Sequence, residues 1–151
     1  MSSCSFFGHR NIVISKNLED KVKGIIKNLI INENCDTFFF GEMGDFDNLC
    51  YEIVSEFKKF YPTINRIYVC TDEKTLFKRK RKNLKKYEQE TVLTLDFSWW
   101  YTIIYYRNLA IIDNSDLVVF YVINKENSGA NKAMNYAIKT KKKYFNIAEI
   151  I

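Results

Sequence analysis

Short apolar runs alternate along the chain with longer segments in which apolar residues recur every three or four positions. The short runs are largely apolar on both faces, which is typical of strands in a parallel sheet covered on two sides. They predict strands at Ser5–Phe7, Thr37–Phe40, Arg66–Cys70, Leu117–Val122 and Lys143–Ile147. The longer segments predict helices at Leu18–Ile31, Asn48–Phe60, Ser98–Ile112 and Ala130–Thr140. This alternation predicts an α/β fold, a Rossmann-like three-layer sandwich with a mainly parallel sheet of about five strands.

One stretch, residues 72–96, does not fit this alternation. It contains Lys78–Lys86 (KRKRKNLKK), a run of seven bases without an acid. Because the whole chain has a formal charge of +5, the rest of it is slightly acidic. We predict a single domain over residues 1–151, with 72–96 as a basic insertion or lid. The basic run is either a solvated helix face or a patch that attracts anionic ligands or nucleic acid.

Composition narrows the class of protein further. With 151 residues, 47% of them hydrophobic, the chain is long enough to bury one core without disulfides or metal. Its cysteines, Cys4, Cys35, Cys50 and Cys70, form no C-x-x-C pair and are expected to be buried thiols, so no cofactor or metal is predicted. The start of the chain does not resemble a signal peptide, and no apolar run reaches the ~20 residues that span a bilayer. We therefore expect a cytoplasmic protein with no membrane partner.

Candidate binding residues follow the first predicted strand. In an open α/β sheet, ligands bind beyond the carboxyl ends of the strands. Gly8-His9-Arg10 stands at such a position, where glycine permits close backbone approach and arginine suits a phosphate or carboxylate. His9 is the only histidine, and it either hydrogen-bonds to hold the loop or takes part in catalysis.

A glycine-containing turn follows the second predicted strand. Gly41-Glu42-Met43-Gly44-Asp45-Phe46-Asp47 runs straight into a helix, so its backbone N–H groups are expected to face an anion. It has neither the G-x-G-x-x-G fingerprint nor a Walker lysine, so neither a dinucleotide cofactor nor ATP hydrolysis is indicated. Asp45 or Asp47 either caps the helix or, like Glu42, accepts hydrogen bonds from ribose hydroxyls.

Two later segments complete the candidate site. Arg107 and Asn108 lie in an otherwise apolar helix, and they either close a structural network or face the ligand. Ser128-Gly129-Ala130 opens the last helix and suits a phosphate, although Ser128 is also an ordinary N-cap. The predicted ligand-binding residues are Gly8, His9, Arg10, Gly41, Glu42, Met43, Gly44, Asp45, Asp47, Arg107, Asn108, Ser128, Gly129 and Ala130.

Several blocks of the sequence together resemble the SLOG superfamily, in particular the small single-domain YspA/YoqJ-like proteins of bacteria and their phages. Cys4–Arg10 resembles the family's C-x-F-x-G-H-R opening, and Phe40–Asp47 its G-G-x-G-x-F-D turn. Three later blocks are similar to K-K-x-Y-P, R-N-x-x-M-(I/V)-D-x-S-D and S-G-(G/A/T)…Y-A, namely Lys58–Pro62, Tyr106–Asp116 and Ser128–Ala137. The blocks stand in the family's order and span nearly the whole chain.

The resemblance implies a Rossmann-like sheet with a pocket for nucleotides or nucleotide-derived signals, and often a homo-oligomer. The lonely-guy branch of the superfamily hydrolyses the N-glycosidic bond of nucleoside monophosphates, and its members carry a motif similar to P-G-G-x-G-T-x-x-E. Here Glu42 replaces the second glycine, Asp45 the threonine and Asn48 the catalytic glutamate. We therefore expect a protein that senses or sequesters a nucleotide-derived signalling molecule, with no turnover.

Two alternatives stay open at this stage. One is a nucleotide N-glycosidase or phosphoribohydrolase related to the lonely-guy enzymes, using Glu42, Asp45 or Asp47. The other is a nucleic-acid-binding module that combines Lys78–Lys86 with the nearby aromatic residues. These aromatics are Phe97, Trp99, Trp100 and Tyr101. The tryptophans equally suit a subunit contact in a homo-oligomer.

Overall fold

The computed structural model describes residues 2–72, 85–93, 100–123 and 128–150, with only the backbone at 100 and 101. Most of the basic run Lys78–Lys86 lies outside these residues, as do Phe97, Trp99 and the start of the predicted helix Ser98–Ile112.

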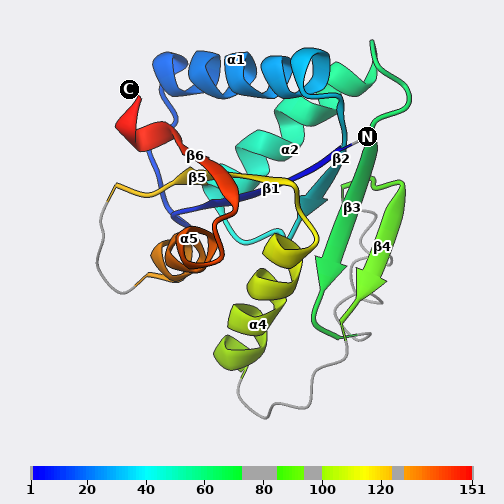
Figure 1. Ribbon diagram of the computed structural model, residues 1–151. Coiled ribbons are helices and arrows are strands. Elements are labelled where there is room, and N and C mark those ends of the chain that lie inside the picture. The colour runs from blue at the N-terminus through cyan, green and yellow to red at the C-terminus, as the bar shows by residue number, and fades with distance from the viewer. Residues whose placement is uncertain (1, 73–84, 94–99, 124–127, 151) are drawn as a thin grey trace.

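The described strands form one parallel sheet between two layers of helices (Figure 1). In the sheet order β4-β3-β2-β1-β5-β6, every neighbouring pair is parallel. Helices α1 and α2 cover one face, and α4 and α5 cover the other. The strands are β1 (Ser2–Gly8), β2 (Cys35–Phe40), β3 (Asn65–Cys70), β4 (Gln89–Val92), β5 (Leu117–Tyr121) and β6 (Lys143–Asn146). The helices are α1 (Lys16–Asn32), α2 (Asp45–Lys58), α4 (Trp100–Asp113), α5 (Gly129–Lys139) and the 3-10 turn η1 (Ile147–Glu149). The predicted Rossmann-like three-layer sandwich is confirmed.

Strand β4 was not predicted as a strand and lies within the segment expected to be an insertion or lid. It pairs with β3 at the edge of the sheet, from Ile67 opposite Gln89 to Cys70 opposite Val92. The described sheet therefore has six strands, where about five were expected. The sequence of β4, QETV, has no apolar run, because an edge strand has few neighbours and its side chains stay partly exposed.

Glu88, directly before β4, ties this edge to β3. The Nε and Nη2 of Arg66 donate to its two carboxylate oxygens at 2.8 and 2.7 Å, and the Arg66 backbone N–H donates to it at 2.9 Å. Partial burial raises the pKa of Glu88, but these hydrogen bonds and the charges of Arg66 and Lys58 outweigh it, so the pKa is below its ordinary value.

The Glu88→Gln variant is expected to lose about 0.5–1 kcal/mol of unfolding free energy at neutral pH. This is the upper part of the range of stabilisation by exposed ion pairs, because the pair is bidentate and partly open to solvent. Because the folded pKa is lowered, this stabilisation is present above the unfolded pKa and disappears as the pH falls through the folded pKa. Urea unfolding of parent and variant at pH 7 and in acid measures the difference in unfolding free energy at each pH. An equal difference at both pH values would contradict the assignment.

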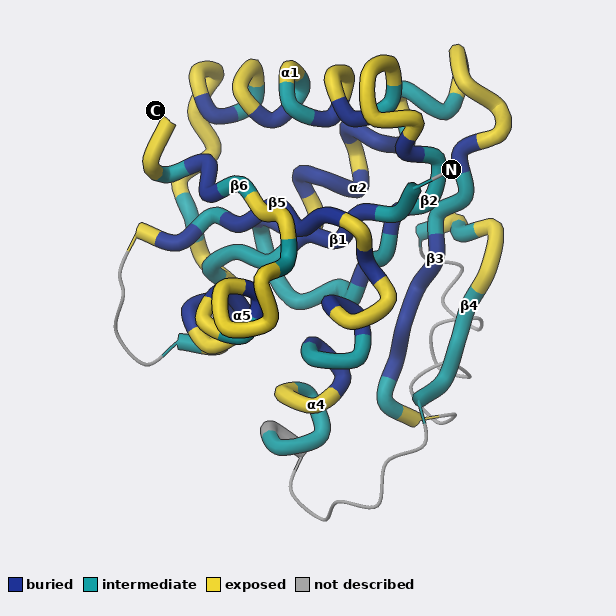
Figure 2. Tube along the Cα trace, viewed as in Figure 1, coloured by how far each residue is buried: buried dark blue, intermediate teal, exposed yellow. Residues whose placement is uncertain are grey.

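Apolar cores lie on both sides of the sheet. Figure 2 shows β1 and β5 buried at the centre, with the outer faces of α1 and α5 exposed. Along β1, Cys4 and Phe6 join the core under α1 and α2, whereas Ser5 points to the other face and hydrogen-bonds with Ser115. Phe6 stacks on Phe38 and Phe40 with ring centroids 6.0 and 5.5 Å apart.

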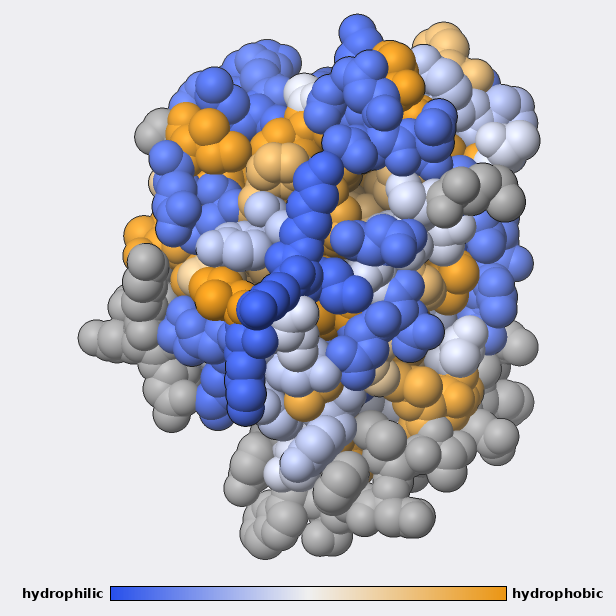
Figure 3. All heavy atoms as spheres, viewed as in Figure 1, coloured by the Kyte–Doolittle hydropathy of each residue, from blue (hydrophilic) through white to orange (hydrophobic). Residues whose placement is uncertain are grey.

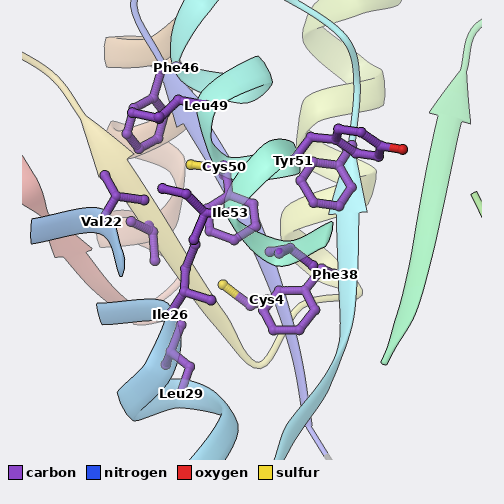
Figure 4. Close-up of a cluster of buried hydrophobic side chains, with 14 of the residues drawn as sticks. Cys4, Val22, Ile26, Leu29, Phe38, Phe46, Leu49, Cys50, Tyr51 and Ile53 are labelled. Atoms are coloured by element: carbon purple, nitrogen blue, oxygen red, sulfur yellow. The ribbon is translucent and has the colours of Figure 1, made fainter. Parts of the chain in front are cut away.

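The helices supply the rest of the larger core, shown in Figure 4. The aliphatic side chains that meet there come from α1 and α2: Val22, Ile26, Leu29, Leu49 and Ile53. All four cysteines are buried and free, as predicted. Burial raises the pKa of the Cys4, Cys50 and Cys70 thiols. Outside the cores, the face in Figure 3 is largely hydrophilic, with apolar residues scattered over it.

Candidate functional site

A pocket of about 210 Å³ lies beyond the carboxyl ends of β1 and β2. The neighbouring strands β1 and β5 lead to helices on opposite faces, so their loops diverge and leave a crevice, the usual ligand position in this class of sheet. Helices α4 and α5 form its other walls (Figure 1). Eleven predicted residues line it: Gly8, His9, Arg10, Gly41, Met43, Asp47, Arg107, Asn108, Ser128, Gly129 and Ala130.

The glycine turn after β2 holds a carboxylate of this chain. The backbone N–H groups of Met43 and Gly41 donate to Oδ2 of Asp47 at 2.9 and 3.2 Å. These amides were expected to face a phosphate, but Asp47 already occupies that position. Helix α2 begins after Gly44, its N-cap, without a side-chain cap, so neither Asp45 nor Asp47 caps it as proposed from the sequence.

Asp45 joins the loop after β1 to the start of α2. Its Oδ2 accepts a hydrogen bond from the Ile12 N–H at 3.0 Å, and its own N–H donates to the Arg10 carbonyl at 2.8 Å. Gly44 lies close against the same loop with φ +126°. Asp45, Gly44 and Glu42 are the predicted residues that do not line the pocket. The first two instead bring Arg10 beside the glycine turn.

Arg107 is the buried cation of the pocket. It is 3% exposed, and it donates from Nη1 to the Gly41 carbonyl at 3.1 Å and from Nη2 to Oδ1 of Asn108 at 3.0 Å. Burial lowers the pKa of Arg107, although the charge of Asp47 opposes this. Burial also disfavours the charged form of Asp47 and so raises its pKa. The hydrogen bonds from Met43 and Gly41 and the charge of Arg107 lower this pKa but do not outweigh burial.

Two polar atoms in these walls stay unsatisfied. Oδ1 of Asp47 and Nε of Arg107 are buried and have no hydrogen-bond partner among the residues that the structure describes. Each such group costs about 1–3 kcal/mol if nothing pairs with it. Arg107 and Asn108 therefore take part in a structural network, beside which one donor on Arg107 and one acceptor on Asp47 have no described partner.

The remaining predicted residues have mainly supporting contacts. Nε2 of His9 accepts a hydrogen bond from the Ile123 N–H at 2.9 Å, the loop-holding role considered above. Ser128 is the N-cap of α5 and accepts a hydrogen bond from the Asn131 N–H at 3.0 Å. Gly129 and Ala130 of the first turn line the pocket, so the partial positive charge of this helix start lies at the pocket. Phe46, within the glycine turn, is fully buried against Tyr121 and therefore does not offer its ring to a base in the pocket.

Sequence reasoning missed the apolar walls of the pocket, because strand and helix positions of this kind look like core residues. They are Phe6, Phe7, Phe39, Ile104 and Ile111. The described residues contain no group of three His, Cys, Asp or Glu side chains placed to hold a metal ion. None of the described helices has the length and apolar character needed to cross a lipid bilayer.

The strand order and the pocket at its reversal define a Rossmann-like domain. Two solved structures of DNA processing protein A (DprA) share this fold. The Streptococcus pneumoniae protein matches with a TM-score of 0.62 and 16% identity, over 96% of this chain and 50% of that one. The Helicobacter pylori protein, whose structure concerns a single-stranded DNA binding mode, matches with a TM-score of 0.65 and 15% identity, over 96% and 64%.

At this identity the likeness establishes the fold alone. This chain spans between half and two thirds of the DprA chains. Their fold is the Rossmann-like one that the SLOG resemblance implies, while the YspA/YoqJ-like branch stays a prediction. No family model matches the chain, nor does any curated protein sequence.

Proposed function

We propose that the chain binds a nucleotide in this pocket. One observation carries the proposal: a buried acceptor on Asp47 and a buried donor on Arg107, both unsatisfied among the described residues, belong to the walls of one pocket. A nucleotide carries groups of both kinds, and pairing requires that these two buried side-chain ends turn toward it. Its phosphate oxygens accept from a guanidinium, and its ribose hydroxyls or base amino groups donate to a carboxylate.

The charges of the walls suggest how the nucleotide lies. The first turn of α5 favours an anion at its end of the pocket, whereas Arg107 and Arg10 lie beside the glycine turn. Asp47 already fills the glycine turn, and its charge repels a phosphate there. We therefore expect the phosphate near Gly129 and the sugar or base near Asp47.

Two sources of the nucleotide are distinguished by experiment. The pocket between the sheet and helices α4 and α5 suits a free nucleotide-derived molecule, which the protein would sense or sequester. The second candidate is a nucleotide within single-stranded DNA, and the observation that favours it is the likeness to the Helicobacter pylori DprA structure. The basic run Lys78–Lys86 supports this candidate through its seven positive charges.

The test uses purified protein with mononucleotides, cyclic nucleotides, ADP-ribose derivatives and a short single-stranded DNA, followed by thermal shift and mass spectrometry. A ligand that raises Tm and is recovered intact supports the proposal, since binding to the folded state adds about 2.7 kcal/mol at 100 times Kd. Stabilisation by DNA alone selects the second candidate. Release of free base would overturn simple binding and make the chain an N-glycosidase, with Asp47 the one of its three candidate acids that lines the pocket.

The Gly129→Leu variant is expected to weaken binding at least tenfold without loss of stability. Among the described residues, a Cβ at Gly129 has no neighbour within 4 Å, so a leucine is expected to fit and to take space in the pocket mouth. Removal of a helical glycine stabilises by up to ~1 kcal/mol. Gly24→Leu is the matched control, because Gly24 on α1 has equally free space on the opposite face of the sheet. Full ligand-induced stabilisation of Gly129→Leu would place binding elsewhere.

A further inference from the structure

A second and more open hollow lies between α4 and α5, with a volume of about 570 Å³. We call it the tyrosine groove, after Tyr105 and Tyr106 of α4 and Tyr136 of α5, which line it together with Lys132 and Lys139. None of these five residues lines the nucleotide pocket. The groove is therefore a separate feature of the same pair of helices.

The tyrosines present aromatic surface that is partly open to solvent. Tyr105 and Tyr106 are 36% and 40% exposed, and their rings meet edge to face with centroids 5.2 Å apart. The hydroxyl of Tyr136 donates to Oδ1 of Asp113 at 2.7 Å, which holds that ring in place. Such positioned rings are suited to stacking on planar groups.

The charge of the groove is positive. Lys132 and Lys139 are two helical turns apart on one face of α5, about 10 Å along its axis. Neither has an ion-pair partner among the described residues. Residues 129–148 contain five lysines and no acid, which outnumber the single negative charge of Asp113, the hydrogen-bond acceptor of Tyr136. The groove therefore attracts anions.

A second copy of the chain is a poor occupant. In a two-fold symmetric contact the same surface is used on both subunits, so each groove would place its two lysines against those of the partner. Within the part of the chain that the structure describes, no carboxylate lines the groove to compensate them. An occupant with repeated negative charge and flat faces fits better.

We propose that the tyrosine groove binds single-stranded nucleic acid, with bases stacked on its tyrosines and phosphates near Lys132 and Lys139. Basic residues combined with aromatic stacking platforms bind single strands with little sequence preference. The proposal extends the second candidate function above, and it does not require that the pocket itself hold a nucleotide.

The charge arm of the test measures binding of a fluorescein-labelled thymidine oligonucleotide by fluorescence anisotropy over a range of salt concentrations. The K132E/K139E variant is expected to bind more weakly and to reduce the slope of log K against log salt by about 1.4, because each phosphate contact to a single strand contributes about 0.7. The K21E/K27E variant is the control, since it makes the same change of charge on exposed lysines of α1, across the sheet. An equal loss in both variants, or in neither, would overturn the proposal.

The stacking arm compares leucine with phenylalanine at Tyr105 and Tyr106. Loss of one stacked base is worth about 1–3 kcal/mol, so Tyr105→Leu and Tyr106→Leu are expected to bind about 5- to 150-fold more weakly, whereas Tyr105→Phe and Tyr106→Phe retain the parent affinity. Equal affinity of the leucine and phenylalanine variants would exclude stacking. A change of molar mass by light scattering, with oligonucleotide binding unchanged, would show a subunit contact instead.

The pocket variant separates the two proposals. Gly129→Leu is expected to weaken binding of the pocket ligand. It is expected to retain the salt-sensitive binding of the oligonucleotide to the tyrosine groove. Strand binding that persists in Gly129→Leu and is lost in K132E/K139E supports the groove even if no free nucleotide binds the pocket. Strand binding lost in Gly129→Leu but unchanged in K132E/K139E would assign the strand to the pocket alone and overturn the groove.

Discussion

Gly44→Val is expected to lower the free energy of unfolding by about 2–6 kcal/mol, which corresponds to a fall in Tm of roughly 4–24 °C. Gly44 has φ +126°, a conformation that side chains with a Cβ rarely adopt. A Cβ there would also lie 2.5 Å from Cα and 2.7 Å from the carbonyl oxygen of Arg10. Because those atoms are backbone, the loop after β1 has to move away from the glycine turn.

Thermal unfolding followed by circular dichroism measures this loss. Gly24→Val is the matched control, since a Cβ at Gly24 meets nothing within 4 Å. It is expected to leave Tm unchanged or slightly higher, because valine is a better helix former than glycine. If both variants unfold at the same temperature as the parent, the close approach of Arg10 to Gly44 is wrong.

Asp47→Ala is expected to lose about 2–5 kcal/mol of stability and to abolish nucleotide binding. The variant removes the acceptor of the part-buried Gly41 and Met43 N–H groups and the negative charge that acts on buried Arg107. Groups left unsatisfied in this way cost up to about 1–3 kcal/mol each. The glycine turn then has no internal partner. Urea unfolding measures the loss of stability, and the ligand-induced thermal shift measures binding.

Asp47→Asn separates the two roles of this residue. Its amide oxygen retains the hydrogen bonds from Gly41 and Met43, so stability is expected to fall by about 1 kcal/mol or less. The second position, Oδ1 in the parent, becomes a donor, so a ligand that donates there is expected to bind about 10-fold or more weakly. Parent-like affinity of Asp47→Asn would show that the ligand does not use this oxygen.

Asp47 changes how the glycine turn is understood. A strand-to-helix turn of this kind normally offers backbone N–H groups to a phosphate. Here a carboxylate from the following helix accepts two of them, so the turn positions Asp47 and Arg10 and does not by itself hold an anion. The cationic groups in the pocket walls are Arg107 and Arg10 beside the glycine turn and the first turn of α5, and Gly129→Leu tests the last of these.

Much of the fold could be predicted from the pattern of apolar residues. Strands buried on two faces must be apolar on both, and helices against a sheet need one apolar stripe, so β1, β2, β3, β5 and β6 were visible in the sequence. Strand β4 was not, because an edge strand needs little burial and its pairing is held by Arg66 and Glu88, which are far apart in the sequence. That residues 72–96 form a basic insertion or lid stays a prediction.

The place of the candidate site also followed from the sequence, because the carboxyl ends of parallel strands converge at one edge of the sheet. That rule accounts for nine of the eleven predicted residues that line the pocket, whereas Arg107 and Asn108 lie on α4 and stood out as polar residues in an apolar helix. It did not determine which side chains face one another. Only the tertiary structure shows that Asp47 fills the glycine turn, that Asp45 binds Ile12 and that His9 holds Ile123.

The sequence by itself therefore determined the class of fold, the edge at which the pocket opens and the residue types available there, since these depend on local periodicity and on the position of residues after strands. The tertiary structure decided the partners of each polar group and the meeting of Tyr105 and Tyr106 with Lys132 and Tyr136 in one groove. Those contacts join distant parts of the chain, and they arise only when α4 and α5 pack side by side on the sheet. The periodic pattern of α4 does not specify which face of α5 it meets, and the pattern of α5 does not specify which face of α4 it meets.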